Sequence, residues 1–133
     1  MSLVHEKLKP YLVPYGDGQY QLAFPFNYIC PKYGVEVRIP ELFIFDGASI
    51  PRMFWATTGS PYDPEYIGPA VIHDYLYKTA KEHYGNQVSR ELADKVFKYA
   101  LGMNKVSDYQ KFKMFRSLRA MGWVAWNKHR KNA

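Results

Sequence analysis

Four ionisable side chains interrupt segments of the chain that are otherwise apolar: Asp46, His73, Asp74 and Asp94. Asp94 falls within the apolar stripe of a predicted helix, where a carboxylate costs several kcal/mol unless it is paired and hydrogen-bonded. His73 is the best available partner. An imidazole oriented by a buried carboxylate has one nitrogen held as a donor and the other able to act as a base. The pattern therefore indicates a His/Asp dyad that could activate water.

The spacing around a central turn supports contact between these two residues. If two helices form an antiparallel hairpin about Gly85-Asn86, His73 lies 12 residues before Gly85 and Asp94 lies 9 residues after it. Comparable separations from a turn place residues at similar heights on paired helices. The alternative is that the pair is purely structural and joins two helices in the core.

Two further carboxylates could bind a cation near the dyad. Asp74 is next to His73, and Asp46 opens a turn with Gly47, whose carbonyl is a potential ligand. Hard cations such as calcium are bound by carboxylate and carbonyl oxygens. Each residue also has a simpler interpretation. Asp46 could accept backbone N–H bonds in its turn, Asp74 could face solvent about 100° around the helix from His73, and Tyr77 could be a core residue.

The elements that must position these side chains are predicted to be strands in the first half of the chain. The apolar runs are short and are separated by Pro and Gly-containing turns, and residues 35–39 alternate between apolar and charged, as in a half-buried strand. The predicted strands are Leu12–Val13, Tyr20–Phe24, Tyr28–Ile29, Val35–Ile39 and Leu42–Phe45.

The second half of the chain predicts three helices. The first begins near Asp63-Pro64 or Pro69 and runs to Lys81. The second is capped by Ser89 and ends near Gly102. The third is capped by Ser107, with Gln110 completing a capping box, and runs to Trp126; its apolar positions, including Tyr109 and Phe112, are expected to face the core. The predicted fold class is α+β, with an antiparallel helix pair carrying the His/Asp site.

The length of 133 residues suits one domain. We divide it into a strand-rich part (1–45), a motif turn with the helix pair (46–104) and a basic C-terminal helix and tail (105–133). The single cysteine, Cys30, cannot form an internal disulfide, which suggests a reducing compartment. No signal peptide and no apolar run of about 20 residues is found in the sequence. It also has neither a phosphate-binding glycine loop nor a GxSxG elbow.

Most of the chain after residue 45 resembles an uncharacterised domain family of bacteriophages and prophages. The resemblance rests on four motifs in order: DGASIP, HDYLY, SRELADKVF and MGWVAW, at residues 46–51, 73–77, 89–97 and 121–126. It implies a viral or prophage origin, and hence a place in the host cytoplasm, in the virion or in both.

The order of DG-A-S, A-x-x-HD-x-x-Y and an inward Asp also resembles the prokaryotic secreted phospholipases A2. That resemblance implies that His73 is the general base, that Asp94 orients it, and that Tyr77 hydrogen-bonds the Asp94 carboxylate. Water would attack an ester carbonyl, and the substrate would be an ester of a lipid or envelope component.

The same resemblance implies a calcium site formed by Asp46, Asp74 and the Gly47 carbonyl. The chain departs from the phospholipase pattern at two positions, since Ala48 and Ala70 stand where the phospholipases have disulfide cysteines. Loss of both together fits a reducing compartment, where packing must replace the disulfides.

The net charge of +6 is concentrated at the C-terminal end. Residues 1–104 carry a net charge of −1, and residues 105–133 carry +7. A basic segment suits nucleic-acid phosphates, an anionic bilayer or an acidic virion partner, and the alternative is a solvated helix face. The cations assigned to its polar side are Lys111, Lys113, Arg116 and Arg119.

Three functions remain open on the sequence. The first is a phage-encoded hydrolase with phospholipase-like, calcium-assisted chemistry. The second is a non-catalytic virion (tail or neck) or assembly protein that retains the fold. The third is a nucleic-acid-binding accessory protein, and it depends only on the charge of the C-terminal segment.

Overall fold

The computed structural model describes residues 9–47 and 65–131. The end of the predicted DGASIP turn and the predicted helix start at Asp63-Pro64 lie outside the described residues. The first sheet has the strand order β1-β2-β5. Strand β1 (Leu12–Gly16) pairs antiparallel with β2 (Gln19–Leu22), and the short β5 (Ile44–Phe45) pairs with the other edge of β2.

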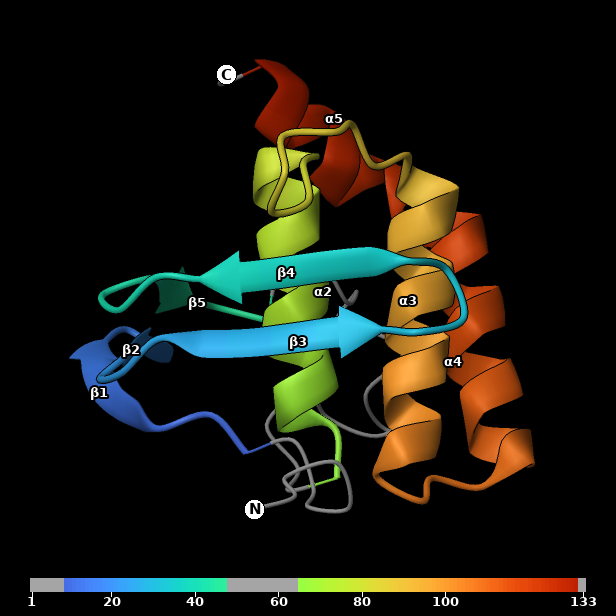
Figure 1. Cartoon of the computed structure of the whole chain (residues 1–133), viewed down its shortest axis with the longest axis horizontal. Helices are drawn as coiled ribbons and strands as arrows, with labels where there is room; N and C mark the ends of the chain where they lie inside the picture. Colours follow the sequence, from blue (N-terminus) through green and yellow to red (C-terminus); the bar gives the residue numbers. More distant parts are fainter. Residues whose placement is uncertain (1–8, 48–64, 132–133) are drawn as a thin grey trace.

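The second sheet is an antiparallel hairpin of β3 (Phe26–Cys30) and β4 (Val35–Ile39). Along β4, the side chains of Val35, Val37 and Ile39 are buried, so the half-buried strand predicted from alternation is confirmed. The hairpin crosses the two central helices, with β4 contacting one and β3 contacting the other (Figure 1).

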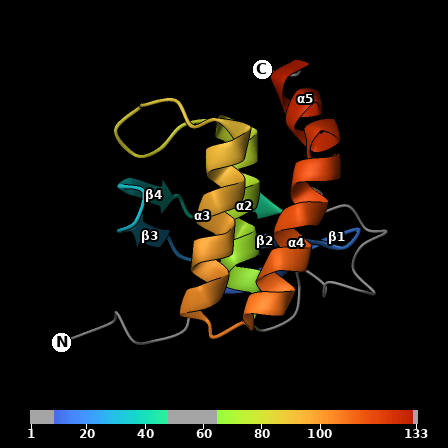
Figure 2. The same ribbon diagram turned by 90° about the vertical axis from the view of Figure 1, so that its right-hand side faces the viewer.

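Those two helices are α2 (Ile67–Thr79) and α3 (Arg90–Met103), which run antiparallel beside each other (Figures 1 and 2). The segment between them turns through residues 82–86, as the predicted hairpin about Gly85-Asn86 requires. Together with the strands before them, these helices confirm the α+β fold class.

The ends of α2 and α3 follow local chemistry. Helix α2 stops two residues before its predicted end because Ala80 adopts a left-handed conformation, with φ of 55°, and its N–H bonds to the Leu76 carbonyl. Ser89 caps α3 as predicted, its hydroxyl accepting the Leu92 N–H at 3.0 Å.

The predicted third helix is wrong in one respect, because it divides into α4 (Asp108–Met121) and α5 (Trp123–Lys131) at Gly122. Ser107 caps α4 by accepting the Gln110 N–H at 3.2 Å, but the side-chain oxygen of Gln110 has no partner, so the reciprocal half of the capping box is absent. Beyond Gly122, α5 turns to pass over the C-terminal end of α2 (Figure 1).

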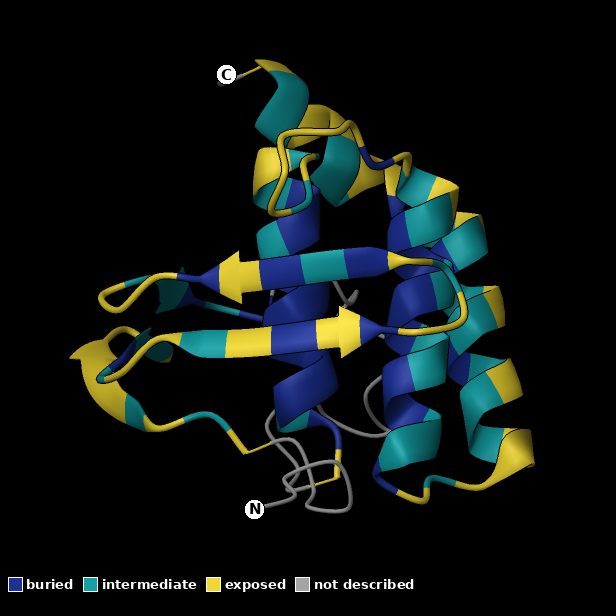
Figure 3. Cartoon of the chain, viewed as in Figure 1, coloured by how far each residue is buried: buried dark blue, intermediate teal, exposed yellow. Residues whose placement is uncertain are grey.

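The core lies between the β3–β4 hairpin and the helices, and α2 carries its most continuous buried surface (Figure 3). The expectation that Tyr109 and Phe112 face the core is wrong, since they are 69% and 50% exposed. Met114 and Leu118 are the buried residues of α4, because the helix turns a different face toward α3. Among the described residues, no helix is both long and apolar enough to cross a bilayer.

Candidate functional site

The His73 and Asp94 side chains meet between α2 and α3. Nε2 of His73 lies 2.8 Å from Oδ1 of Asp94, and both side chains are fully buried. The expected contact is therefore present. Since Asp94 is ionised, we assign the shared proton to Nε2, which leaves Nδ1 as the nitrogen able to accept a proton.

Two more side chains complete the hydrogen bonding of Asp94. The Tyr77 hydroxyl donates to the same oxygen, Oδ1, at 2.7 Å, as the phospholipase resemblance implied. Arg119, from α4, donates to Oδ2 at 2.8 Å, and Arg90 lies 3.7 Å from Oδ2. Helix α2 thus contributes two side chains to this single buried carboxylate, and α3 and α4 contribute one each.

The protonation of this cluster follows from its hydrogen bonds. Burial by itself would raise the pKa of Asp94, but the hydrogen bonds from His73, Tyr77 and Arg119 outweigh it and hold the pKa below its usual range. Burial, followed by the charge of Asp94, raises the pKa of the Tyr77 hydroxyl. Asp94 is therefore a carboxylate acceptor and Tyr77 a neutral donor near neutral pH.

The orientation of the His73 ring is also set by aromatic neighbours. Its centroid lies 4.1 Å from that of Tyr77 and 5.0 Å from that of Phe97. The far side of Tyr77 packs edge-on against Trp126, with centroids 5.2 Å apart. The dyad thus has fixed geometry, which general base catalysis and a structural role would both require.

The other expected site residues form a second cluster around Lys78. The Lys78 ammonium lies 3.2 Å from Oδ2 of Asp74 and 3.9 Å from Oδ2 of Asp46, and it donates to the Ile44 carbonyl at 2.9 Å. The interpretation of Asp74 as a solvated helix-face residue is wrong, since its side chain is fully buried. Gly47 is buried too, with φ of 71°.

The buried Asp74 carboxylate has few hydrogen-bond donors around it. Neither carboxylate oxygen accepts a well-aligned side-chain hydrogen bond, although the Lys78 ammonium and the Asp46 backbone N–H approach it. Burial raises the pKa of Asp74 to about 7, with the charge of Lys78 opposing the rise and that of Asp46 adding to it. Asp74 is thus a buried acid that changes protonation near neutral pH.

A calcium ion fits this cluster poorly. Calcium takes six to eight oxygen ligands, and residues 9–47 and 65–131 contain no group of three or more His, Cys, Asp or Glu side chains suited to a metal. The lysine ammonium already lies between the two carboxylates. We therefore derive no chemical step through calcium.

Three members of the two clusters were missed or misplaced by sequence reasoning. Arg119 was assigned to a polar, solvated helix side but donates to the buried Asp94. Arg90 precedes Asp94 by four residues and Lys78 follows Asp74 by four, so an i,i+4 search for charge pairs would have found both. Nothing in the local sequence marks Arg119, because its contact depends on how α4 packs against α3.

Comparison with known proteins gives a family but no activity. The chain is 29% identical over 103 residues to "Uncharacterized protein y4jT" of Sinorhizobium fredii (strain NBRC 101917 / NGR234), an alignment that covers 77% of this chain. It spans 29% of that relative's length. No solved structure matches the chain. Residues 20–118 match the family model described as "Protein of unknown function (DUF1353)", so the chain belongs to this family.

Proposed function

We propose that this protein is a hydrolase of ester bonds in which His73 is the general base. The observation that carries the proposal is the hydrogen bond between Nε2 of His73 and a carboxylate that Tyr77 and Arg119 also hold. No other described histidine is held by a buried carboxylate in this way.

The chemistry follows from the proton on Nε2. The reaction requires the buried dyad to open to water and to the ester. Nδ1 of His73 then accepts a proton from water as the water oxygen bonds to the ester carbonyl carbon. The bond from that carbon to the leaving oxygen then breaks, and the proton passes from Nδ1 to the alcohol product. Asp94 does not change protonation; it orients the ring and stabilises the imidazolium that forms in between. The proposed substrate is an ester of a lipid or envelope component.

The test is turnover of soluble short-chain esters and of phospholipid vesicles, with calcium and with a chelator. His73→Gln keeps a polar side chain but removes the base, and we expect a loss of about 10²-fold to 10⁴-fold. His83→Gln, in the turn between α2 and α3, is the matched control and should retain activity. Turnover by His73→Gln equal to that of the wild type would overturn the proposal. Activity that survives the chelator would exclude calcium assistance. We expect this result because the Lys78 ammonium already lies between the Asp46 and Asp74 carboxylates.

The alternative function is a non-catalytic virion or assembly protein that retains the fold. It is favoured by the complete burial of His73, Asp94 and Tyr77, which keeps the dyad away from solvent. In that case His73→Gln lowers the free energy of unfolding but no ester is turned over by any variant. Recovery of the protein in purified phage particles, with no turnover, would favour this function over the hydrolase.

We also propose a phage or prophage origin for the gene, with the product in the host cytoplasm, the virion or both. The support is the resemblance over four ordered motifs, of which HDYLY carries the His73 side chain of the dyad. Sequencing the flanking genes tests it: structural or lysis genes of a phage beside this gene would support the origin, and a neighbourhood of bacterial housekeeping genes would contradict it.

A further inference from the structure

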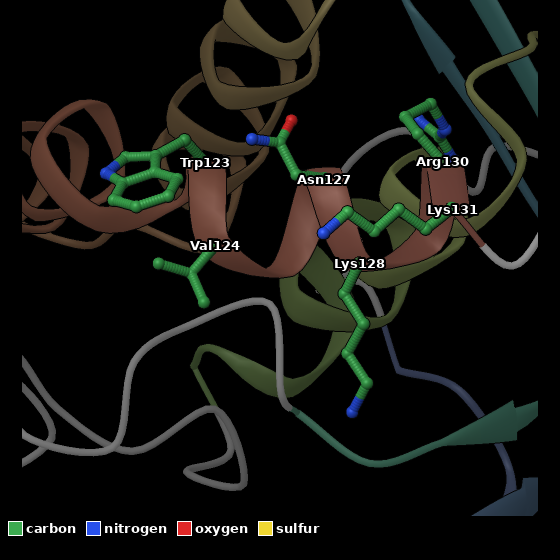
Figure 4. A pocket seen from close by; sticks show the side chains of 6 residues that line it. All are labelled: Trp123, Val124, Asn127, Lys128, Arg130 and Lys131. Carbon is green, nitrogen blue, oxygen red and sulfur yellow. The ribbon is translucent and has the colours of Figure 1, made fainter.

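The outward face of α5 combines apolar and cationic side chains. Trp123 and Val124 are each 51% exposed. Lys128 and Lys131 follow Val124 on the same side of the helix, at spacings of four and seven residues, and Trp123 lies about 100° around the helix from Val124. With Asn127 and Arg130, these residues line a hollow of about 620 Å³ (Figure 4). Helix α5 contains no acidic residue. We call Trp123, Val124, Lys128 and Lys131 the α5 surface.

Two other residues of α5, Arg130 and Trp126, attach the helix to the rest of the protein. Arg130 donates to the carbonyl oxygens of Tyr77 and Lys78, at 2.6 and 3.0 Å, and its guanidinium stacks 4.3 Å from the Trp126 ring centroid. Trp126 in turn packs against Tyr77. The α5 surface is therefore displayed on an anchored helix, and its two half-exposed apolar residues are not those that hold the helix in place.

We propose that the α5 surface docks on an anionic lipid bilayer. Tryptophan is favoured at the boundary between headgroups and acyl chains, and Val124 beside it would bury apolar surface there. Lys128 and Lys131 are placed to meet anionic headgroups, and each lysine near such a surface contributes a similar increment of binding. The excess of positive charge in residues 105–133 supplies long-range attraction of the same sign.

Two other partners fit these observations less well. A nucleic acid would contact the two lysines. Val124, however, has no flat ring with which to stack on a base, so only Trp123 of the two apolar residues would contribute to that binding. A second copy of the chain packed symmetrically on this face would place Lys128 and Lys131 near the same lysines of the other copy, and these like charges repel.

The test is co-sedimentation with vesicles of neutral phosphatidylcholine, with or without phosphatidylglycerol. Both lipids are ether-linked, so that the measurement does not depend on hydrolysis and stands apart from the proposed enzyme activity. We expect the wild-type protein to bind the anionic vesicles at least tenfold more tightly than the neutral ones. Raised salt should weaken the binding, because the lysine contribution is screened.

The variants separate the two components of the surface. Lys128→Gln with Lys131→Gln should weaken binding to anionic vesicles about 25-fold, since each lysine contributes about fivefold. Trp123→Ala should weaken it about tenfold. The matched controls are Ile29→Ser and Lys95→Gln, which change an exposed apolar and an exposed cationic residue away from α5 and should bind as the wild type does.

Equal binding to neutral and anionic vesicles would overturn the proposal, as would equal binding by the α5 variants and the controls. Failure to bind vesicles, together with salt-dependent binding to a DNA duplex that the two lysine substitutions remove, would overturn it in favour of nucleic acid. Because each variant changes an exposed side chain, its thermal unfolding should match that of the wild type, and this confirms that lost binding is not lost folding.

Discussion

The Tyr77 hydroxyl occupies the space beside Gly122 that any larger residue would need. A Cβ built on Gly122 would lie 2.5 Å from this oxygen and 3.1 Å from Nη1 of Arg90, and 2.6 Å from the Leu118 carbonyl oxygen. The glycine that separates α4 from α5 therefore lies directly against the donor that holds Asp94. The break in the C-terminal helix and the His/Asp cluster are parts of one packing arrangement.

Replacing this glycine should disturb the cluster. We expect Gly122→Ala to lower the free energy of unfolding by about 1–3 kcal/mol, since the added methyl group must displace Tyr77 or the helix backbone. Urea denaturation measures it. Gly102→Ala is the matched control, because its added Cβ meets only the flexible end of Lys111, at 3.2 Å. That change should be neutral or stabilise α3 by up to about 1 kcal/mol. Equal losses for both variants would contradict the role given to Gly122.

Removing the charge of Asp94 should have the largest effect on stability. Asp94→Asn leaves Arg119 and Arg90 beside a neutral group in a buried site, so we expect a loss of about 3–5 kcal/mol in the free energy of unfolding. The control is Glu91→Gln on the same helix, whose side chain is 59% exposed, and it should change stability by less than about 0.5 kcal/mol. A loss of less than about 0.5 kcal/mol in the free energy of unfolding of Asp94→Asn would show that the carboxylate is not essential to the packing of the three helices.

The hydrogen bond from the Tyr77 hydroxyl to Asp94 should contribute about as much to stability as any one buried hydrogen bond to a charged group. We expect Tyr77→Phe to lower the free energy of unfolding by about 1.5–3 kcal/mol and to raise the pKa of Asp94, which loses one of its donors. Carboxyl NMR titration measures the second effect. Tyr75→Phe, on the same helix, is the control and should leave the pKa of Asp94 unchanged. An unchanged pKa in Tyr77→Phe would contradict the assignment.

The raised pKa of Asp74 makes stability depend on pH in a defined direction. In the native state Asp74 keeps its proton up to about pH 7, whereas in the unfolded state it loses the proton near its ordinary pKa of 3.8. The native state therefore binds more protons between these values, and the free energy of unfolding falls as pH rises from about 4 to 7, by an amount on the order of 4 kcal/mol. Above pH 7 this contribution is constant.

Asp74→Asn should remove this dependence, because the amide does not titrate. Guanidinium denaturation at a series of pH values measures it, and the variant should gain stability relative to the wild type as pH rises. Asp108→Asn is the control, since the Asp108 side chain is fully exposed. A parallel pH profile for the wild type and Asp74→Asn would show that Asp74 is ionised throughout the range.

Much of the site could be predicted from the sequence because it follows from one strong local rule. A carboxylate in a helical apolar stripe must have a partner, and only His73 lay at a matching distance from the turn. The hydrogen bond between His73 and Asp94 is the outcome. The same kind of rule predicted the Ser89 cap and the alternating strand β4, since both depend on residues close together in the sequence.

The tertiary structure decided the features that depend on how whole elements cross. Arg119 reaches Asp94 only because α4 packs against α3, and Lys78 lies between Asp46 and Asp74 only because β5 passes beside α2. Tyr109 and Phe112 have the types of core residues, yet they face solvent because α4 uses Met114 and Leu118 instead.

The sequence by itself thus determined which residues need partners, since residue type and local period set the cost of burying them. The fold decided the remaining partners, such as Arg119 for Asp94 and Asp46 for Lys78, because those contacts depend on how whole elements cross, which no local spacing encodes.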